Sequence, residues 1–232
     1  MKNKAMEYLS HDPLLHMDML EAIRRGNAEI MYAASGGVLL KERYSGAYML
    51  SSRDMVLGKK LIDSLQEPEL IEVHQQEMAL YAFKRHDFLD KLECFQAVYM
   101  KEQKPEITMG LEIRRPAPGE MEVIKENYNK ISEEELSKVN ELGNLYVGVK
   151  DKKMIGFVGS QLEGSIGLLE VFPEFRRCGY GMELEKHMIC LMLDKGYVPF
   201  GQVASHNEKS LAMQKKLGLE ISKDMLYWLI RY

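Results

Sequence analysis

The strongest constraint on this 232-residue chain is a buried strand that runs through a glycine-containing turn into a helix. Gly167–Phe172 is the strand, and Pro173 ends its pairing because proline has no N–H to donate. The turn reads Arg176-Arg177-Cys178-Gly179-Tyr180-Gly181, and the helix runs on to Lys195. Because its two glycines permit unusual backbone angles, we expect the backbone here to approach a ligand closely.

The start of that helix is a candidate anion site. The first N–H groups of a helix have no partner within it, and the helix dipole adds partial positive charge. Arg176 and Arg177 bring further charge, so the turn suits a phosphate or diphosphate. Two alternatives stay open. One is an ordinary strand–turn–helix junction. The other is a dinucleotide site, although Leu184 replaces the third glycine of G-x-G-x-x-G.

A wider pattern links this turn to a known family. Val171-x-Pro173-Glu174-x-Arg176-x-x-Gly179-x-Gly181 resembles the signature of the GNAT superfamily of acyl-CoA N-acyltransferases. Asn207-x-x-Ser210 and Lys216-Leu217-Gly218-Leu219 resemble its second signature, with Leu where the family has Phe after the glycine. The resemblance covers about Thr108 to Tyr232, and Lys195–Phe200 looks most like the glycine N-acyltransferase-like branch.

The resemblance implies a fold and a cosubstrate. The fold would be α+β (mixed α/β), with a GNAT-like central, mostly antiparallel sheet flanked by helices, as a tandem pair. The cosubstrate would be acetyl-CoA or another acyl-CoA, without a metal. The strand backbone would bind the pantetheine arm, the turn amides the diphosphate, and Asn207, which also suits a helix N-cap, the arm near the thioester. The implied cofactor-binding residues are Leu169, Glu170, Val171, Arg176, Arg177, Cys178, Gly179, Tyr180, Gly181, Met182, Asn207, Ser210 and Gln214.

The catalytic groups are harder to assign. Family members often have a Tyr acid seven residues after the Asn and a Glu base five residues before it, but this chain has Gln214 and Gln202 there. A glutamine cannot donate a proton as a phenol does. The Val171 N–H could stabilise an oxyanion. The side-chain candidates are Glu170, His206, Tyr146 and Glu163, and each also has a plain structural interpretation as a surface or core residue.

Two functions are consistent with this pattern. The first is an N-acyltransferase that moves an acetyl or other short acyl group from acyl-CoA to a primary amine of a small molecule or peptide. The amine would attack directly in a ternary complex. The second is an acyl-CoA-binding sensor or scaffold without catalysis, as the two glutamines suggest.

Composition excludes other classes of partner. The net charge is −4, and the densest basic clusters are pairs such as Arg114-Arg115, so we expect no nucleic acid. Apolar runs such as Ile189–Leu193 are far too short to cross a membrane. The cysteines Cys94, Cys178 and Cys190 have no metal-ligand spacing, and free thiols favour the cytoplasm.

The chain divides into two halves with a similar order of elements. Residues 101–106 are polar, contain a proline, and form the expected linker. We expect residues 1–105 to form a GNAT-like domain that lacks the diphosphate turn, and residues 106–232 to form the acyl-CoA-binding domain. The first half could supply a wall of the acceptor pocket or a homodimer surface. Its first helix should be capped by Asp12, with Pro13 at the first helical position and Gly26 after its end.

Overall fold

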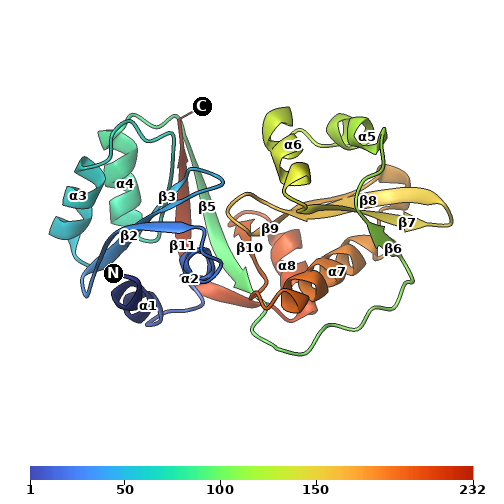
Figure 1. The fold of residues 1–232 in the computed structure, drawn as a ribbon, viewed down its shortest axis with the longest axis horizontal. Helices are drawn as coiled ribbons and strands as arrows, with labels where there is room; N and C mark the ends of the chain where they lie inside the picture. Colours follow the sequence, from blue (N-terminus) through green and yellow to red (C-terminus); the bar gives the residue numbers. More distant parts are fainter. Residues whose placement is uncertain (232) are drawn as a thin grey trace. The chain divides into compact units, whose positions relative to one another are not determined.

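The computed structural model describes residues 1–231 and shows an α+β chain with a seven-stranded and a four-stranded sheet (Figure 1). The elements are, in order, α1 (Lys2–Leu9), α2 (Met17–Arg24), β1 (Ala28–Ala34), β2 (Gly37–Glu42), β3 (Tyr48–Ser52), α3 (Met55–Asp63), β4 (Leu70–Val73), α4 (Gln76–Arg85), β5 (Asp90–Val98), β6 (Glu112–Arg114), α5 (Glu120–Asn127), α6 (Glu133–Glu141), β7 (Leu145–Lys150), β8 (Lys153–Ser160), β9 (Ile166–Val171), a 3₁₀ turn (Pro173–Phe175), α7 (Tyr180–Asp194), β10 (Phe200–Ala204), α8 (Glu208–Leu217) and β11 (Glu220–Ile230). The predicted fold class is confirmed.

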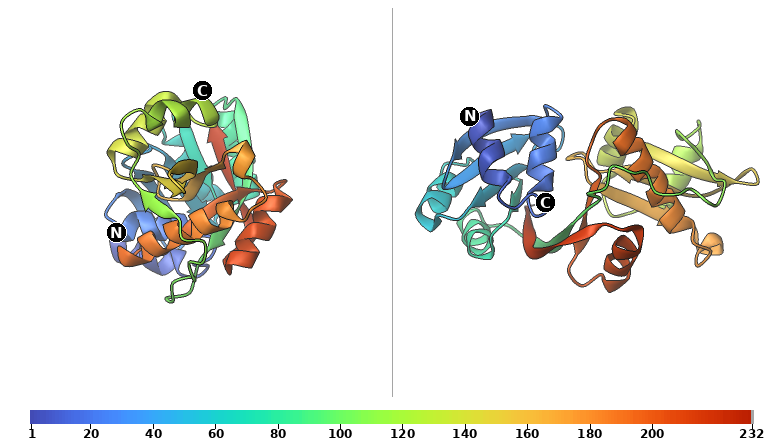
Figure 2. Two further views of the ribbon diagram at one scale, coloured as in Figure 1. Left: turned by 90° about the vertical axis from the view of Figure 1, so that its right-hand side faces the viewer. Right: turned by 90° about the horizontal axis from the view of Figure 1, so that it is seen from below.

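The first compact unit comprises Met1–Val98 together with the described residues from Gln202 onward. Its sheet has the strand order β1-β2-β3-β4-β11-β5-β10. β3 pairs with β4 in parallel, whereas β11 pairs antiparallel with both β4 and β5. Helices α3 and α4 cover one face, where Ile62 and Met78 are fully or almost fully buried in the core. Helices α1 and α2 lie on the other face (Figure 2).

The second compact unit comprises Tyr99–Gly201 and contains the four-stranded sheet β6-β7-β8-β9, antiparallel throughout. Helices α5 and α6 pack on one face through Ile124, Leu136 and Val139, which contact a core that includes Phe157. Helix α7 packs on the other face, against β8 and β9 (Figure 2). These units are not the two contiguous halves that the sequence suggested, because β11 completes the sheet of the first unit. The division at residue 105 stays a prediction about the two sequence copies.

The order of elements supports that internal similarity. In the first copy, β1-β2-β3-α3-β4-α4-β5 follows the same sequence of strands and helices as β7-β8-β9-α7-β10-α8-β11 in the second. Among the described residues, no helix combines the length and apolar character that a membrane crossing requires.

The predicted start of the first long helix is wrong. The Asp12 carboxylate accepts a hydrogen bond from the Leu15 N–H at 3.2 Å within an irregular turn, and the helix begins at Met17 with His16 as its N-cap. The end is as expected, because Gly26 follows the helix at a φ of 78°. Helix α1 was missed, since its start has no side-chain cap that a sequence could reveal.

Candidate functional site

Strand β9 offers a free edge for an extended ligand. Among the described strands it lies last in its sheet and pairs only with β8. The Phe172 N–H donates to the Ile155 carbonyl at 3.0 Å, so by alternation the Glu170 backbone also faces β8. The backbones of Leu169 and Val171 therefore face outward. Of the three residues predicted to bind the pantetheine arm through their backbone, these two have the required orientation.

The first residue of β9, Ile166, lies close to Gly201 within the second unit. A Cβ added to Gly201, the last residue of the second unit, would lie 2.9 Å from the Ile166 carbonyl oxygen. Glycine is therefore required at this position. Further along β9, the Val171 carbonyl accepts a hydrogen bond from Arg176 Nε at 2.9 Å, and Arg176 Nη2 bonds the Glu170 carboxylate at 2.8 Å. Arg176 thereby ties the turn to the strand.

The turn after β9 is exposed and has unusual backbone angles. Arg177 has a φ of 64°, and Gly179, the N-cap of α7, has a φ of 85°. Residues Arg176–Gly179 are all exposed. Backbone turns that contain left-handed residues are common in concave anion sites, where successive N–H groups converge. Gly179 has no side chain with which to cap the helix, so the first amides of α7 stay available to a ligand.

The Glu183 side chain connects the first turn of α7 to the segment before β6. Its carboxylate is buried and accepts hydrogen bonds from the N–H groups of Thr108 and Met109, each at 2.6 Å. Lys186 lies 3.3 Å from the same carboxylate. Burial alone would raise the pKa of Glu183, but these donors hold the pKa below its ordinary value. The sequence analysis missed this residue, because its partners lie far away along the chain.

Gly181 is not required by the packing of the protein. A Cβ added there would lie 3.6 Å from Val171 Cγ2, which is an ordinary contact, and the φ of Gly181 is not in the left-handed region. A glycine that packing does not require, in the first turn of a helix, is consistent with the close approach of a ligand.

The equivalent junction in the first copy is closed. The Asp54 side chain accepts hydrogen bonds from the N–H groups of Val56 and Leu57, so a carboxylate already occupies the start of α3. The preceding strand, β3, is hydrogen-bonded to β4 in parallel over Tyr48–Leu50, so no edge is free there. These contacts support the expectation that only the second copy kept an anion-binding turn.

The residues of the second signature lie in the first unit. Asn207 caps α8 by accepting a hydrogen bond from the Ser210 N–H at 3.1 Å, which matches its interpretation as a helix cap. His206 beside it is exposed, and Gln214 is buried on α8. Gln202 is held by three partners: its amide nitrogen donates to Glu72 at 2.6 Å and to Asp18 at 3.2 Å, and its oxygen accepts from Trp228 at 2.6 Å. The sequence analysis missed these partners.

The remaining candidates have ordinary environments. Tyr146 is half-buried in β7. Glu163 accepts a hydrogen bond from the Ser165 hydroxyl in the loop before β9. Cys178 is exposed, and its thiol lies 3.5 Å from the Arg176 carbonyl. Tyr180 and Met182 are half-buried in the first turn of α7.

Comparison with known proteins finds a family model that matches part of the second copy. The family model described as "FR47-like protein" matches residues 144–229, which include β9, the turn and α7. Among curated proteins, none is similar enough to match the chain.

Solved structures share the fold at low sequence identity. A Drosophila protein superimposes with a TM-score of 0.63 and 15% identity, over 84% of this chain and 74% of that one. A GCN5-related N-acetyltransferase from Kribbella flavida gives 0.58 and 12%, over 94% and 95%. A GCN5-related N-acetyltransferase-like protein from Streptococcus suis gives 0.55 and 13%, over 98% and 100%.

Proposed function

We propose that this chain is an acyl-CoA-dependent N-acyltransferase of the GNAT superfamily. It would move an acetyl or other short acyl group to a primary amine of a small molecule or peptide, by direct attack in a ternary complex. The observation that carries this proposal is the pair formed by the free edge of β9 and the uncapped start of α7.

The two parts of the site suit the two parts of the cosubstrate. An amide-containing pantetheine arm can pair with the outward backbone of Leu169 and with the Val171 N–H as an added strand does, whereas the Val171 carbonyl is already bonded to Arg176. A diphosphate can accept hydrogen bonds from the turn amides at the positive end of the α7 dipole, with Arg177 exposed beside it. Binding both parts fixes the position of the thioester, and positioning alone supplies much of the rate of such reactions.

The transfer needs a neutral amine and a polarised carbonyl. Deprotonating a lysine-like amine near pH 7 costs about 4 to 5 kcal/mol unless the site assists. The outward N–H of Val171 is a candidate oxyanion donor. Glu170 is paired with Arg176, which makes it a weaker candidate base than the sequence suggested. His206 stays a candidate proton carrier on its exposed loop.

A second function rests on a separate observation. Gln202 and Gln214 replace the family's usual base and acid, and the Gln202 amide is fully engaged with Asp18, Glu72 and Trp228. A chain with these substitutions could bind acyl-CoA as a sensor without fast turnover.

One pair of measurements tests the proposal and separates the two functions. Calorimetric titration should show that CoA binds much more tightly than pantetheine, which lacks the diphosphate. Equal affinities would contradict the assignment of the turn. A thiol-release assay with acetyl-CoA and a panel of amino acids, polyamines and peptides should show repeated turnover with at least one amine. Tight CoA binding without turnover on any amine would favour the sensor.

A further inference from the structure

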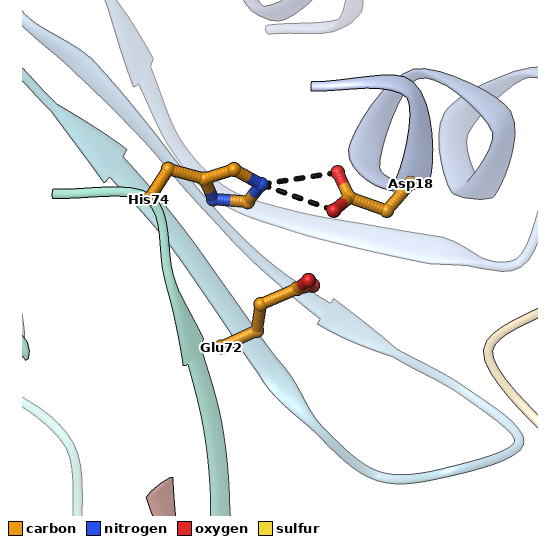
Figure 3. Close-up of side chains that lie close together, drawn as sticks. All are labelled: Asp18, Glu72 and His74. Carbon is orange, nitrogen blue, oxygen red and sulfur yellow. Dashed lines mark hydrogen bonds and ion pairs between the residues drawn. The ribbon is translucent and has the colours of Figure 1, made fainter. Parts of the chain in front are cut away.

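Three side chains that could bind a metal converge inside the first unit (Figure 3). Asp18 lies in α2, Glu72 lies in β4, and His74 directly follows β4. Because Glu72 and His74 are two residues apart in extended chain, their side chains face the same side of the sheet. One ligand atom from each lies within 4.8 Å of the other two. All three side chains are buried, and Asp18 and Glu72 have no exposed surface at all.

The charges of this cluster need a cation. Two carboxylates side by side, away from water, are strongly unfavourable unless a proton or a positive charge balances them. A divalent metal ion balances both carboxylates while the imidazole stays neutral. The competing arrangement has a doubly protonated His74 paired with Asp18 and a proton shared by the two carboxylates.

The surrounding contacts resemble the support around bound metals. The ring nitrogen Nδ1 of His74 lies 3.2 Å from the Leu50 carbonyl, and histidines that bind a metal through one nitrogen commonly donate the other N–H to such a group. The other nitrogen, Nε2, lies 3.1 Å from both oxygens of Asp18. Two ligand atoms that share a tetrahedral zinc ion are about 3.3 Å apart, given zinc–ligand bonds of about 2.0 to 2.1 Å.

The two carboxylates are oriented in turn by fixed donors. The Gln202 amide donates to Glu72 Oε1 at 2.6 Å and to Asp18 Oδ2 at 3.2 Å. Gln202 itself is held by the Trp228 indole N–H. The Met19 N–H donates to Asp18 Oδ1 at 2.5 Å. Each candidate ligand therefore has its orientation set from outside the cluster.

We propose that Asp18, Glu72 and His74 bind a Zn²⁺ ion in the interior of the first unit. One imidazole and two carboxylates form a nitrogen and oxygen ligand set that suits zinc, whereas Ca²⁺ and Mg²⁺ prefer oxygen ligands alone. The ion links α2 to β4 and, through Gln202 and Trp228, to β10 and β11. This site goes beyond the proposed acyl transfer. It also departs from the sequence analysis, which expected no metal.

The test is the zinc content of the full-length protein. The protein is stripped with a chelator, incubated with ZnCl₂, freed of excess metal and analysed by mass spectrometry for zinc. One ion per chain and a melting temperature that rises on adding zinc are expected. Glu72→Gln and His74→Gln should lose the ion, whereas the matched control Glu93→Gln, on β5 of the same unit and partly exposed, should keep it.

The outcomes decide between the two arrangements. A wild-type protein that retains no zinc overturns the proposal and assigns the cluster to a hydrogen-bonded ion pair, even if the variants fail to fold. Zinc that is retained by folded Glu72→Gln and His74→Gln variants overturns it equally, because the ion must then lie elsewhere.

Discussion

At the scale of single residues, the two glycines of the turn have different roles. Gly179 adopts a φ of 85°, which other residues rarely adopt, so the fold itself requires it. Gly181 has room for a side chain and an ordinary φ, so a glycine there is consistent with the close approach of a ligand rather than with a demand of the fold. The sequence could identify the pair but could not divide these roles, because φ and the space around a Cβ are properties of the folded chain.

Gly181→Ala separates folding from binding. Alanine at this helical position should leave the free energy of unfolding unchanged or raise it by about 0.4 to 1 kcal/mol, since alanine favours helices. The added methyl should obstruct the diphosphate and weaken CoA binding at least about tenfold, or 1.4 kcal/mol. Urea denaturation and calorimetry measure the two effects. A folded variant with unchanged affinity would remove the turn from the site. Gly36→Ala, in the β1–β2 turn, is the control for binding.

Glu183→Gln should destabilise the protein by about 1 to 3 kcal/mol near neutral pH, because the buried carboxylate accepts hydrogen bonds from two backbone amides. The pKa of Glu183 is lowered in the fold, so its stabilisation is complete above the ordinary pKa and is lost as the pH falls through the lowered pKa. Urea denaturation at several pH values should show the difference between wild type and variant shrinking toward acid. A constant difference would contradict this account, and the exposed Glu134→Gln should change little.

At the scale of elements, sequence patterns locate the strand and the helix on either side of the turn. β9 and α7 lie where the sequence predicts a strand over Gly167–Phe172 and a helix that runs on to Lys195. The exceptions are α1 and the start of α2, where local hydrogen bonds of Asp12 and His16 replace the expected cap. Patterns along the chain report local preferences, and these two exceptions depend on contacts that such patterns do not contain.

Asp54→Ala tests whether the first copy is closed to anions by its own cap. Losing the two hydrogen bonds at the start of α3 should cost about 1 kcal/mol of stability. CoA affinity should stay unchanged, because the binding turn belongs to the second copy. Thermal denaturation and calorimetry give both values. A marked loss of CoA affinity in a folded variant would mean that the first copy takes part in binding.

At the scale of the whole molecule, the sequence could not reveal where β11 pairs. Strand β11 falls within residues 106–232, which the sequence assigns to the second half, but it lies between β4 and β5 in the sheet of the first unit. The Asp18, Glu72 and His74 cluster was hidden for the same reason, since it joins segments far apart along the chain. Such pairings depend on topology, which apolar periodicity does not encode.

A fragment of residues 1–105 should therefore not fold alone. Without β11, the strands β4 and β5 lose the partner that separates them, and the apolar side chains Leu226 and Leu229, fully buried in the intact protein, are missing. Circular dichroism and urea denaturation of the fragment should show no cooperative transition. A sharp transition would show that the first half is an independent domain. Adding a synthetic peptide of residues 219–231 should restore structure.

The place of β11 also affects how the chain is made. The middle of the larger sheet stays vacant while the ribosome synthesises more than a hundred further residues after β5, which at about 5 to 20 residues per second takes on the order of ten seconds. During that time, the unpaired edges of β4 and β5 and the apolar core beside them are exposed to other nascent chains. Chaperone demand and yield on expression should therefore depend on the final strand more than on the turn after β9.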